Sequence, residues 1–130
     1  MLLQTTLCLA AAAAVINLWL GIRISRVRMS AKILHGDGGN EALMRRMRAQ
    51  ANFIENVPLA LILIGAIELS TKGGKWLAVV GGLFMLARLA HALGMDSTRP
   101  NPLRAGGTLV TMLTLLGLAV VAILIALGKF

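Results

Sequence analysis

The sequence predicts an all-α membrane protein, namely a bundle of four transmembrane helices. Hydrophobic residues make up 58% of the 130 residues and charged residues only 14%, whereas an ordinary soluble domain carries roughly 25% charge. A soluble core of this size could not bury so much apolar surface. Four apolar runs account for the excess, and none alternates in polarity as the strand of an outer-membrane barrel does. The composition therefore excludes a conventional soluble enzyme, and the single cysteine, Cys8, excludes an internal disulfide scaffold.

We expect one domain over residues 1–130, with helices at about 2–22, 41–69, 76–95 and 107–127. The first run is long enough to cross about 30 Å of hydrocarbon. A cleaved signal peptide is its alternative reading, which the lack of a preceding Lys or Arg disfavours. The second run is apolar only over 57–69, which is too short to cross the membrane. The helix reaches that length only if the polar stretch 48–56 belongs to it. Arg88 and His91 interrupt the third run, and the fourth contains no charge.

Turn-forming residues separate these runs. Residues 35–40, His-Gly-Asp-Gly-Gly-Asn, indicate a tight turn, and Asn40 can cap a helix that begins at Glu41. The glycines also suit a phosphate-binding loop, but the lysine of that motif and the preceding strand are missing from the sequence. Pro100 and Pro102 are expected to keep the third connection extended.

The 13 basic residues are distributed unevenly. Ten lie between the first two helices or at and beyond the end of the third: Arg23, Arg26, Arg28, Lys32, Arg45, Arg46, Arg48, Arg88, Arg99 and Arg104. Only Lys72, Lys75 and Lys129 lie on the other side. This asymmetry predicts cytoplasmic first and third loops and termini that face outward. The basic rim would attract anionic lipids, so the pI near 11.5 needs no nucleic acid, and a chain without Tyr offers little stacking for bases.

A polar stripe enters the second predicted helix. Arg48, Asn52 and Glu55 follow one another at i, i+4 and i+7 and therefore share a face, with Arg45 close to it. A lone charge at mid-membrane costs about 2.5–3.5 kcal/mol on insertion scales, so such groups face protein or water and usually pair. Pro58 follows within one turn and frees a backbone carbonyl. The alternative is that these polar residues bind no ligand and only hold helices together. This alternative stays open.

The third predicted helix supplies a second polar group. Arg88 and His91 lie at i, i+3 and share a face, and Asp96 and Arg104 follow on the same side of the membrane. The two clusters would make a cationic pocket with one carboxylate, suited to an anionic, peptide-like ligand because arginine forks bind carboxylates. A proton path through Glu55 and His91 is an alternative. No metal site is expected, since the two histidines are far apart in the sequence, and any nucleophile would come from the substrate.

These residues carry a family resemblance. Residues 48–55, Arg-Ala-Gln-Ala-Asn-Phe-Ile-Glu, followed by Pro58, resemble the Arg-Ala-(His/Gln)-x-Asn-x-x-Glu signature of the MAPEG family, the membrane-associated proteins in eicosanoid and glutathione metabolism. The stretch 36–40 is similar to the bacterial branch, and residues 88–91, Arg-Leu-Ala-His, precede Arg104 with a spacing similar to that of family members. The resemblance covers nearly the whole chain.

The resemblance implies a homotrimer in the bacterial inner membrane, with glutathione bound between neighbouring subunits near the cytoplasmic side. The residues implied to hold glutathione are Arg48, Gln50, Asn52, Glu55, Arg88, His91 and Arg26, with Arg23 as the alternative to Arg26. Arg104 matches the arginine implied to be catalytic through stabilisation of the glutathione thiolate. The function implied is a glutathione transferase or peroxidase-like activity toward lipophilic electrophiles that arrive through the bilayer.

The sequence also departs from the family pattern. Glutathione-using relatives carry tyrosines where this chain has Asn56 and either His91 or Met95, and a serine where it has Ala105. Another thiol or an amphiphile is therefore an alternative ligand. Two further alternatives stay open: a non-catalytic module that binds lipids or a partner, and a channel or transporter.

Overall fold

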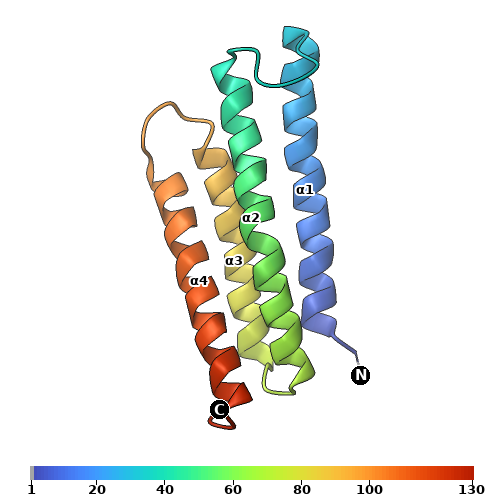
Figure 1. Ribbon diagram of the computed structural model, residues 1–130, viewed down its shortest axis with the longest axis vertical. Coiled ribbons are helices and arrows are strands. Elements are labelled where there is room, and N and C mark those ends of the chain that lie inside the picture. Colours follow the sequence, from blue (N-terminus) through green and yellow to red (C-terminus); the bar gives the residue numbers. More distant parts are fainter. Residues whose placement is uncertain (1) are drawn as a thin grey trace.

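The computed structural model describes residues 2–130 and consists of four antiparallel helices (Figure 1). They are α1 (Gln4–Ala31), α2 (Glu41–Leu69), α3 (Lys75–Gly94) and α4 (Pro102–Ala126). All four are long and apolar enough to cross a membrane, and residues 2–130 contain no strand. The predicted all-α fold with four transmembrane helices is therefore confirmed.

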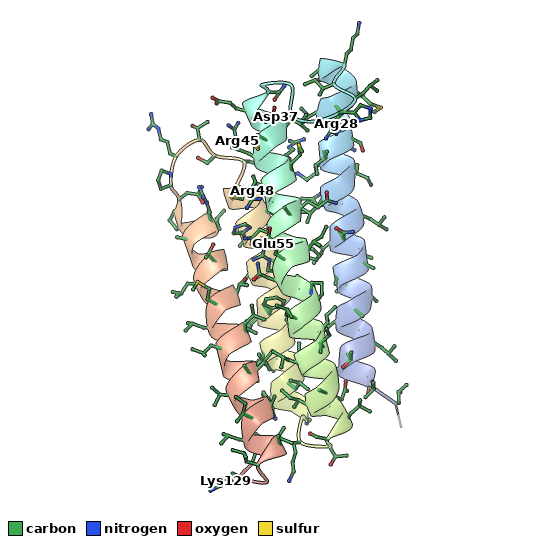
Figure 2. All side chains as sticks on the ribbon, in the orientation of Figure 1. Arg28, Asp37, Arg45, Arg48, Glu55 and Lys129 are labelled. Atoms are coloured by element: carbon green, nitrogen blue, oxygen red, sulfur yellow. The ribbon has the colours of Figure 1, made fainter. Side chains whose placement is uncertain are left out.

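Because successive helices run in opposite directions, the first and third connections lie at the same end of the bundle (Figure 1). The α1–α2 and α3–α4 connections meet at one end of the bundle, and both chain ends lie at the other (Figure 1). Figure 2 shows Arg28 and Arg45 at the end with the two connections and Lys129 at the opposite end. The uneven distribution of basic residues along the sequence is thus a difference between the two ends of the molecule, and cytoplasmic connections stay the prediction that follows from it.

Helix α1 is longer than predicted. The helix was expected to end near Ile22, where the apolar run stops, but it continues to Ala31. It ends where Lys32 adopts the left-handed conformation (φ 57°) and the backbone N–H of Ile33 donates to the carbonyl of Arg28 over 3.0 Å. The apolar run defines the part of the helix in hydrocarbon, whereas the helix itself extends through the polar head-group region.

Helix α2 has the expected bounds. Asn40 caps it by accepting the N–H of Leu43 at 3.0 Å, and Glu41 in its first turn suits the positive end of the helix dipole. Pro58 lies inside α2 without ending it.

Helix α4 begins earlier than predicted. The expected start was near 107, with Pro102 in an extended connection, but Pro102 is the first residue of the helix. Proline is favoured there because its missing N–H would have no partner in the first turn. Asn101 caps this end by accepting the N–H of Arg104 at 3.0 Å. Helix α3 differs from the predicted range by one residue at each end.

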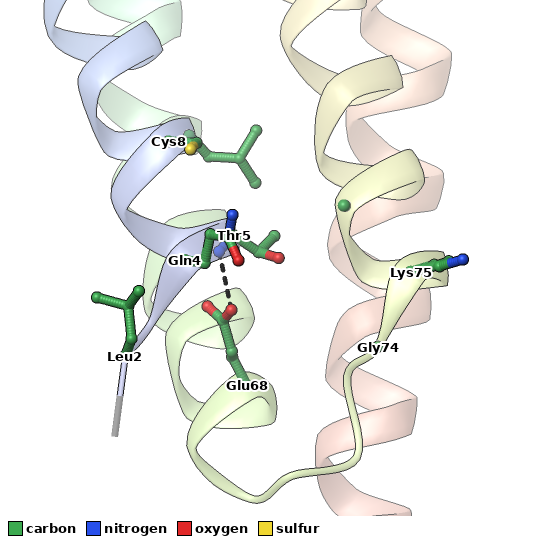
Figure 3. A pocket seen from close by; sticks show the side chains of 9 residues that line it. Leu2, Gln4, Thr5, Cys8, Glu68, Gly74 and Lys75 are labelled. Carbon is green, nitrogen blue, oxygen red and sulfur yellow. Dashed lines mark hydrogen bonds between the residues drawn. The ribbon is translucent and has the colours of Figure 1, made fainter.

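The N-terminus of α1 is capped from another helix. Leu3 stands at the cap position and supplies no side-chain bond. The carboxylate of Glu68, near the end of α2, instead accepts the N–H of Thr5 at 2.8 Å (Figure 3). It also accepts the N–H of Thr6 at 2.8 Å and the hydroxyl of Thr6 at 2.7 Å. A negative charge at this end also complements the helix dipole. Glu68 therefore fastens α1 to α2 at the end of the bundle opposite the α1–α2 and α3–α4 connections (Figure 1).

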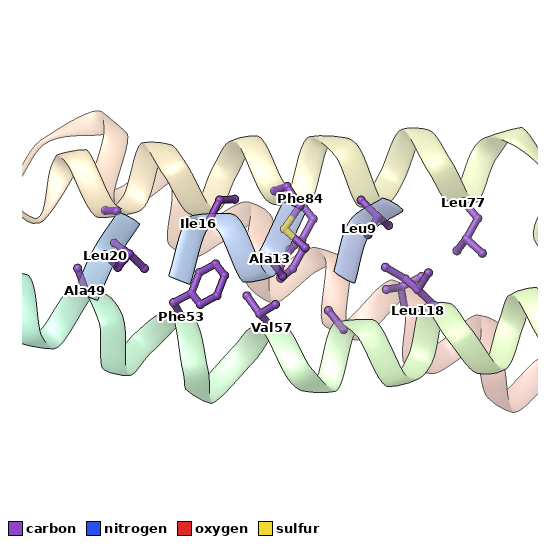
Figure 4. Packing of buried hydrophobic residues seen from close by; sticks show 14 of the residues in the cluster. Leu9, Ala13, Ile16, Leu20, Ala49, Phe53, Val57, Leu77, Phe84 and Leu118 are labelled. Atoms are coloured by element: carbon purple, nitrogen blue, oxygen red, sulfur yellow. The ribbon is translucent and has the colours of Figure 1, made fainter. Parts of the chain in front are cut away.

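The core lies along the middle of the bundle; most of its residues come from α1, α2 and α3, and α4 adds Leu118 (Figure 4). Helix α2 contributes a buried face at the spacing of an amphipathic helix, consisting of Leu43, Ala49, Phe53, Val57, Ala60, Ile64 and Ile67. Small residues bring α3 and α4 close together: a Cβ added at Gly107 would stand 2.7 Å from the carbonyl oxygen of Ala87. Most of the large apolar side chains of α4 face outward, as expected of a helix that contacts lipid.

A candidate ligand-binding site around a buried arginine

Arg88 lies at the centre of the candidate site. It is 1% exposed and joins three helices. Its Nη1 donates to the hydroxyl of Thr111 on α4 over 3.0 Å, and its Nη2 donates to Oδ1 of Asn52 on α2 over 2.5 Å. The Nη2 also lies 3.5 Å from Nδ1 of the buried His91, one turn along α3. The polar groups predicted on the second and third helices therefore meet at one depth, through Asn52, Arg88 and His91.

The positive charge of Arg88 has no counterion within the described chain. In residues 2–130 no carboxylate oxygen lies within 4.0 Å of its guanidinium, since the ion pairs there are Arg23–Asp96, Arg46–Asp96 and Arg45–Glu41. Its Nε is also buried without a hydrogen-bond partner. Neutral oxygens satisfy part of the guanidinium fork but cannot offset its charge, and burying an uncompensated charge is costly. The arrangement would be stabilised by an anion bound nearby.

Arg48 and Glu55 lie on the outward side of α2. Both side chains are exposed, and Figure 2 shows them on α2 in the half of the bundle that carries the two connections. Within the part of the chain that the structure describes, neither has a side-chain hydrogen bond or an ion pair. Their separation of seven residues is about 10 Å along a helix, at 1.5 Å per residue, which is too far for a direct bond. These two groups therefore remain available to a ligand or a neighbouring subunit.

Gln50 and Arg26 do not join the Arg88 cluster. Gln50 points to the other side of α2, where its Nε2 donates to Oδ1 of Asn17 on α1 over 3.4 Å. It lines a hollow of about 480 Å³ between α1 and α2, together with Arg28 and Met47. Arg26 is exposed near the end of α1. The residues of the family motif thus face two sides of α2, so one chain alone does not bring all of them together.

Arg23 forms an ion pair with Asp96 and does not join the Arg88 cluster. The expected alternative was that Arg23 reaches the glutathione site, but its Nη2 pairs with Asp96 in the α3–α4 connection. Its guanidinium also stands over the ring of Trp19, 4.8 Å from the ring centre.

Arg104 lies in the first turn of α4 and is exposed. It lines a hollow of about 530 Å³ on the outer side of α4, with Ala105 and Thr108. Its backbone packs on Gly94, where the lack of a side chain permits the approach. The proposed thiolate-stabilising group is thus on the same end of the bundle as Arg88 but on the surface. Because Arg88 is buried and Arg104 lies on the surface, this chain by itself does not place the two guanidinium groups in one open pocket.

Sequence reasoning missed several polar residues at this end and at the opposite one. Thr111 was not singled out, although it is a buried hydroxyl within a strongly apolar run. Its hydroxyl also donates to the carbonyl of Gly107 over 2.8 Å. The cap by Glu68 and the pairing of Asp96 were missed as well, and no local sequence signal indicates either contact. Across residues 2–130 no three His, Cys, Asp or Glu side chains are grouped to hold a metal ion.

Comparison with known proteins agrees with this picture of an apolar bundle with a polar site. The model of the MAPEG family matches residues 6–124. The inner membrane protein YecN of Escherichia coli K12, and that of E. coli O6:H1 strain CFT073, are each 32% identical over 72 residues, which is 55% of this chain and 54% of the relative. The chain thus spans about half the length of the curated relatives it matches. With the four apolar helices, this likeness supports a multi-pass protein of the inner membrane. Because the family model covers nearly all of it, the chain belongs to the MAPEG family.

Proposed function

We propose that this protein binds glutathione at an interface between subunits of a homotrimer and uses its thiol to conjugate or reduce lipophilic electrophiles. The family is glutathione-related in general. The observation that carries the proposal for this chain is the buried Arg88, whose charge is met only by neutral oxygens within the described residues. Glutathione carries two carboxylates, and an arginine is suited to bind either of them.

The exposed stripe on α2 supports a site between subunits. Arg48 and Glu55 are charged groups on a membrane-spanning helix and are exposed in one chain. Each would cost about 2.5–3.5 kcal/mol if it faced lipid at mid-membrane. A neighbouring subunit and a bound tripeptide would remove both from lipid. In that arrangement Glu55 could accept hydrogen bonds from the ammonium group of glutathione, and Arg48 could donate hydrogen bonds to one of its carboxylates.

The two faces of α2 also favour more than one subunit. Asn52 points toward Arg88, whereas Gln50 points toward α1 and lines the hollow between α1 and α2. Arg104 opens onto the outer side of α4. These groups could contact one ligand only if the α1–α2 side of one subunit faced α4 of another. The proposed glutathione site therefore requires more than one subunit, as the proposed homotrimer provides.

The chemistry would use the substrate's own nucleophile. A guanidinium near the glutathione sulfur favours the thiolate, which is the reactive form. Attack on a chlorinated aromatic forms a carbon–sulfur bond at the ring carbon, and chloride leaves with the bonding electrons. With a hydroperoxide, sulfur takes the terminal oxygen and the alcohol leaves; a second glutathione then yields the disulfide and water. In both reactions Arg104 would stabilise the thiolate, while the apolar surfaces of α3 and α4 would admit the electrophile from the bilayer.

The test begins with the protein purified in mild detergent. We expect glutathione binding by calorimetry and conjugation of 1-chloro-2,4-dinitrobenzene, and native mass spectrometry should show a trimer. Arg104→Ala should reduce the ultraviolet absorbance of the bound thiolate and lower turnover by roughly 10²-fold, as for the loss of one charge-stabilising group. Arg99→Ala is the matched control, because Arg99 is exposed in the preceding connection. No binding at millimolar glutathione would reject the proposal.

Asn52→Asp provides a sharper variant. The change is nearly isosteric and places a carboxylate 2.5 Å from Nη2 of Arg88, where the amide oxygen now stands. This internal anion would compensate the guanidinium, so we expect glutathione affinity to fall by tenfold or more, about 1.4 kcal/mol. Undiminished affinity would show that Arg88 does not bind the ligand.

If glutathione does not bind the parent protein and solute flux appears in liposomes, the transporter alternative replaces the proposal. If neither is seen, the non-catalytic module is favoured.

A further inference from the structure

A cluster of charged side chains joins three parts of the molecule at the end that carries the two connections. Asp96 belongs to the turn after α3, and its Oδ2 pairs with Nη2 of Arg23 on α1. Its Oδ1 lies 4.0 Å from Nε of Arg46 on α2. Arg46 in turn donates from Nη1 to the backbone carbonyl of Arg23 over 2.9 Å. The single carboxylate of Asp96 therefore links α1, α2 and the α3–α4 connection.

The environment of Arg23 makes this link more than a surface ion pair. Only 11% of the Arg23 side chain is exposed, against 38% for Asp96, and its guanidinium stands over Trp19. Its Nη1 is buried without a hydrogen-bond partner, so Asp96 supplies the principal polar partner of this guanidinium. Removing the carboxylate that faces this largely buried guanidinium leaves an uncompensated charge behind. By contrast, Glu41 is 87% exposed and lies 3.7 Å from Arg45 on the same helix, a contact of the kind that contributes little.

The same connection carries the first turn of α4. Asn101 donates from Nδ2 to the carbonyl of Gly94 over 2.7 Å and accepts the N–H of Arg104 at 3.0 Å. The backbone of Arg104 packs directly on Gly94. The end of α3 and the start of α4 thus form one unit, and Arg104 belongs to it. Deeper in the bundle, Arg88 and Asn52 fix α3 against α2, while at the membrane surface Asp96 fixes this unit against α1 and α2.

We propose that Asp96 is a positioning residue, which places Arg104 relative to α1 and α2 by anchoring the α3–α4 connection to Arg23 and Arg46. Asp96 itself touches no ligand in this account. Without its charge, the connection would separate from α1 while the Arg88 cluster stays intact. The catalytic consequence rests on the proposed function, because it assumes that Arg104 acts on a bound thiol. The anchoring itself does not depend on that function.

Trp19 allows the anchoring to be measured without any substrate. In a Trp76→Phe background Trp19 is the remaining tryptophan, and it lies under the guanidinium that Asp96 holds. We expect Asp96→Asn to shift Trp19 emission and to increase its quenching by acrylamide. Glu41→Gln, the matched control, should change neither. Asp96→Glu should restore the parent signal, and acetate should restore it in Asp96→Ala by replacing the excised carboxylate between Arg23 and Arg46.

The second measurement separates positioning from ligand binding. In Asp96→Asn we expect kcat for conjugation to fall by roughly tenfold or more, since small misplacements of a catalytic group carry large penalties, while the Kd for glutathione stays near the parent value. Equal effects of Asp96→Asn and Glu41→Gln on Trp19 and on kcat would overturn the proposal, as would failure of both Asp96→Glu and acetate to restore the signal. If the parent protein binds no glutathione, the proposed function fails, and the Trp19 measurements still decide the anchoring.

Discussion

Replacing Arg88 by methionine tests whether this buried guanidinium serves the ligand or the fold. Methionine is apolar and flexible and can fill the space that the arginine stem occupies. The change removes the uncompensated charge and leaves the oxygens of Asn52 and Thr111 behind. Thr111 keeps its bond to the carbonyl of Gly107, and Asn52 is only partly buried, so neither becomes an isolated buried group.

The opposing contributions nearly cancel. The bonds from Arg88 to Asn52 and Thr111 are made by a charged donor to neutral oxygens, and such bonds are worth about 1.5–3 kcal/mol each. Against this loss, the membrane-spanning helix no longer carries an arginine, a gain of about 2.5–3.5 kcal/mol on insertion scales. The buried apolar methionine adds about 1.5–3 kcal/mol. We therefore expect the free energy of unfolding of Arg88→Met to lie between about 2 kcal/mol below and about 3.5 kcal/mol above the parent value.

The assay is unfolding in mixed micelles with increasing dodecyl sulfate, followed by far-ultraviolet circular dichroism. Phe84→Ala calibrates the assay, since Phe84 is fully buried and its truncation should cost about 3–5 kcal/mol. Glutathione at a hundred times its Kd should stabilise the parent protein by about 2.7 kcal/mol and should leave Arg88→Met unchanged. A loss in Arg88→Met as large as that in Phe84→Ala, without glutathione, would refute the reasoning and make Arg88 a residue of the fold.

Further expected outcomes concern the two contacts that fix the helices. Glu68→Gln weakens the cap of α1 and should lower the free energy of unfolding by about 1 kcal/mol, with faster hydrogen exchange at the amides of Thr5 and Thr6 and not in α4. Gly107→Ala places a Cβ 2.7 Å from the carbonyl of Ala87 and should cost about 1–3 kcal/mol by overpacking. Gly106→Ala, where no atom lies within 4 Å of the added Cβ, should be neutral or slightly stabilising; equal effects at both glycines would contradict this account.

Much of the fold could be predicted because hydrophobic length and turn chemistry are local properties. The start of α2 followed from Asn40, whose cap bond to Leu43 the structure confirms. The end of α1 could not be found in this way, because the apolar run reports the hydrocarbon boundary and not the end of the helix. The start of α4 was misplaced because Pro102 was treated as a residue that prevents helix formation, whereas in the first turn it favours a helix.

The candidate site was predictable only in part. Helical spacing and the cost of lipid exposure predicted that Asn52 and Arg88 belong to one polar pocket, and their side chains do bond. The same motif placed Gln50 with them, yet residues two apart on a helix point in nearly opposite directions, and Gln50 contacts α1. Thr111 and Asp96 acquire their partners from distant segments, so no local pattern marks them.

Most of the acidic side chains already have a hydrogen-bond or ion-pair partner within the described chain. The sequence has five Asp and Glu residues. Asp37 accepts the N–H of Gly39 in the first connection at 2.9 Å, Glu41 lies 3.7 Å from Arg45, Glu68 caps α1, and Asp96 anchors the turn after α3. Among the residues that the structure describes, Glu55 alone has neither a side-chain hydrogen bond nor an ion pair, although it is exposed on a membrane-spanning helix. Because a carboxylate facing lipid is costly, we expect its partner to come from outside the single chain, as a neighbouring subunit or the ammonium group of a ligand.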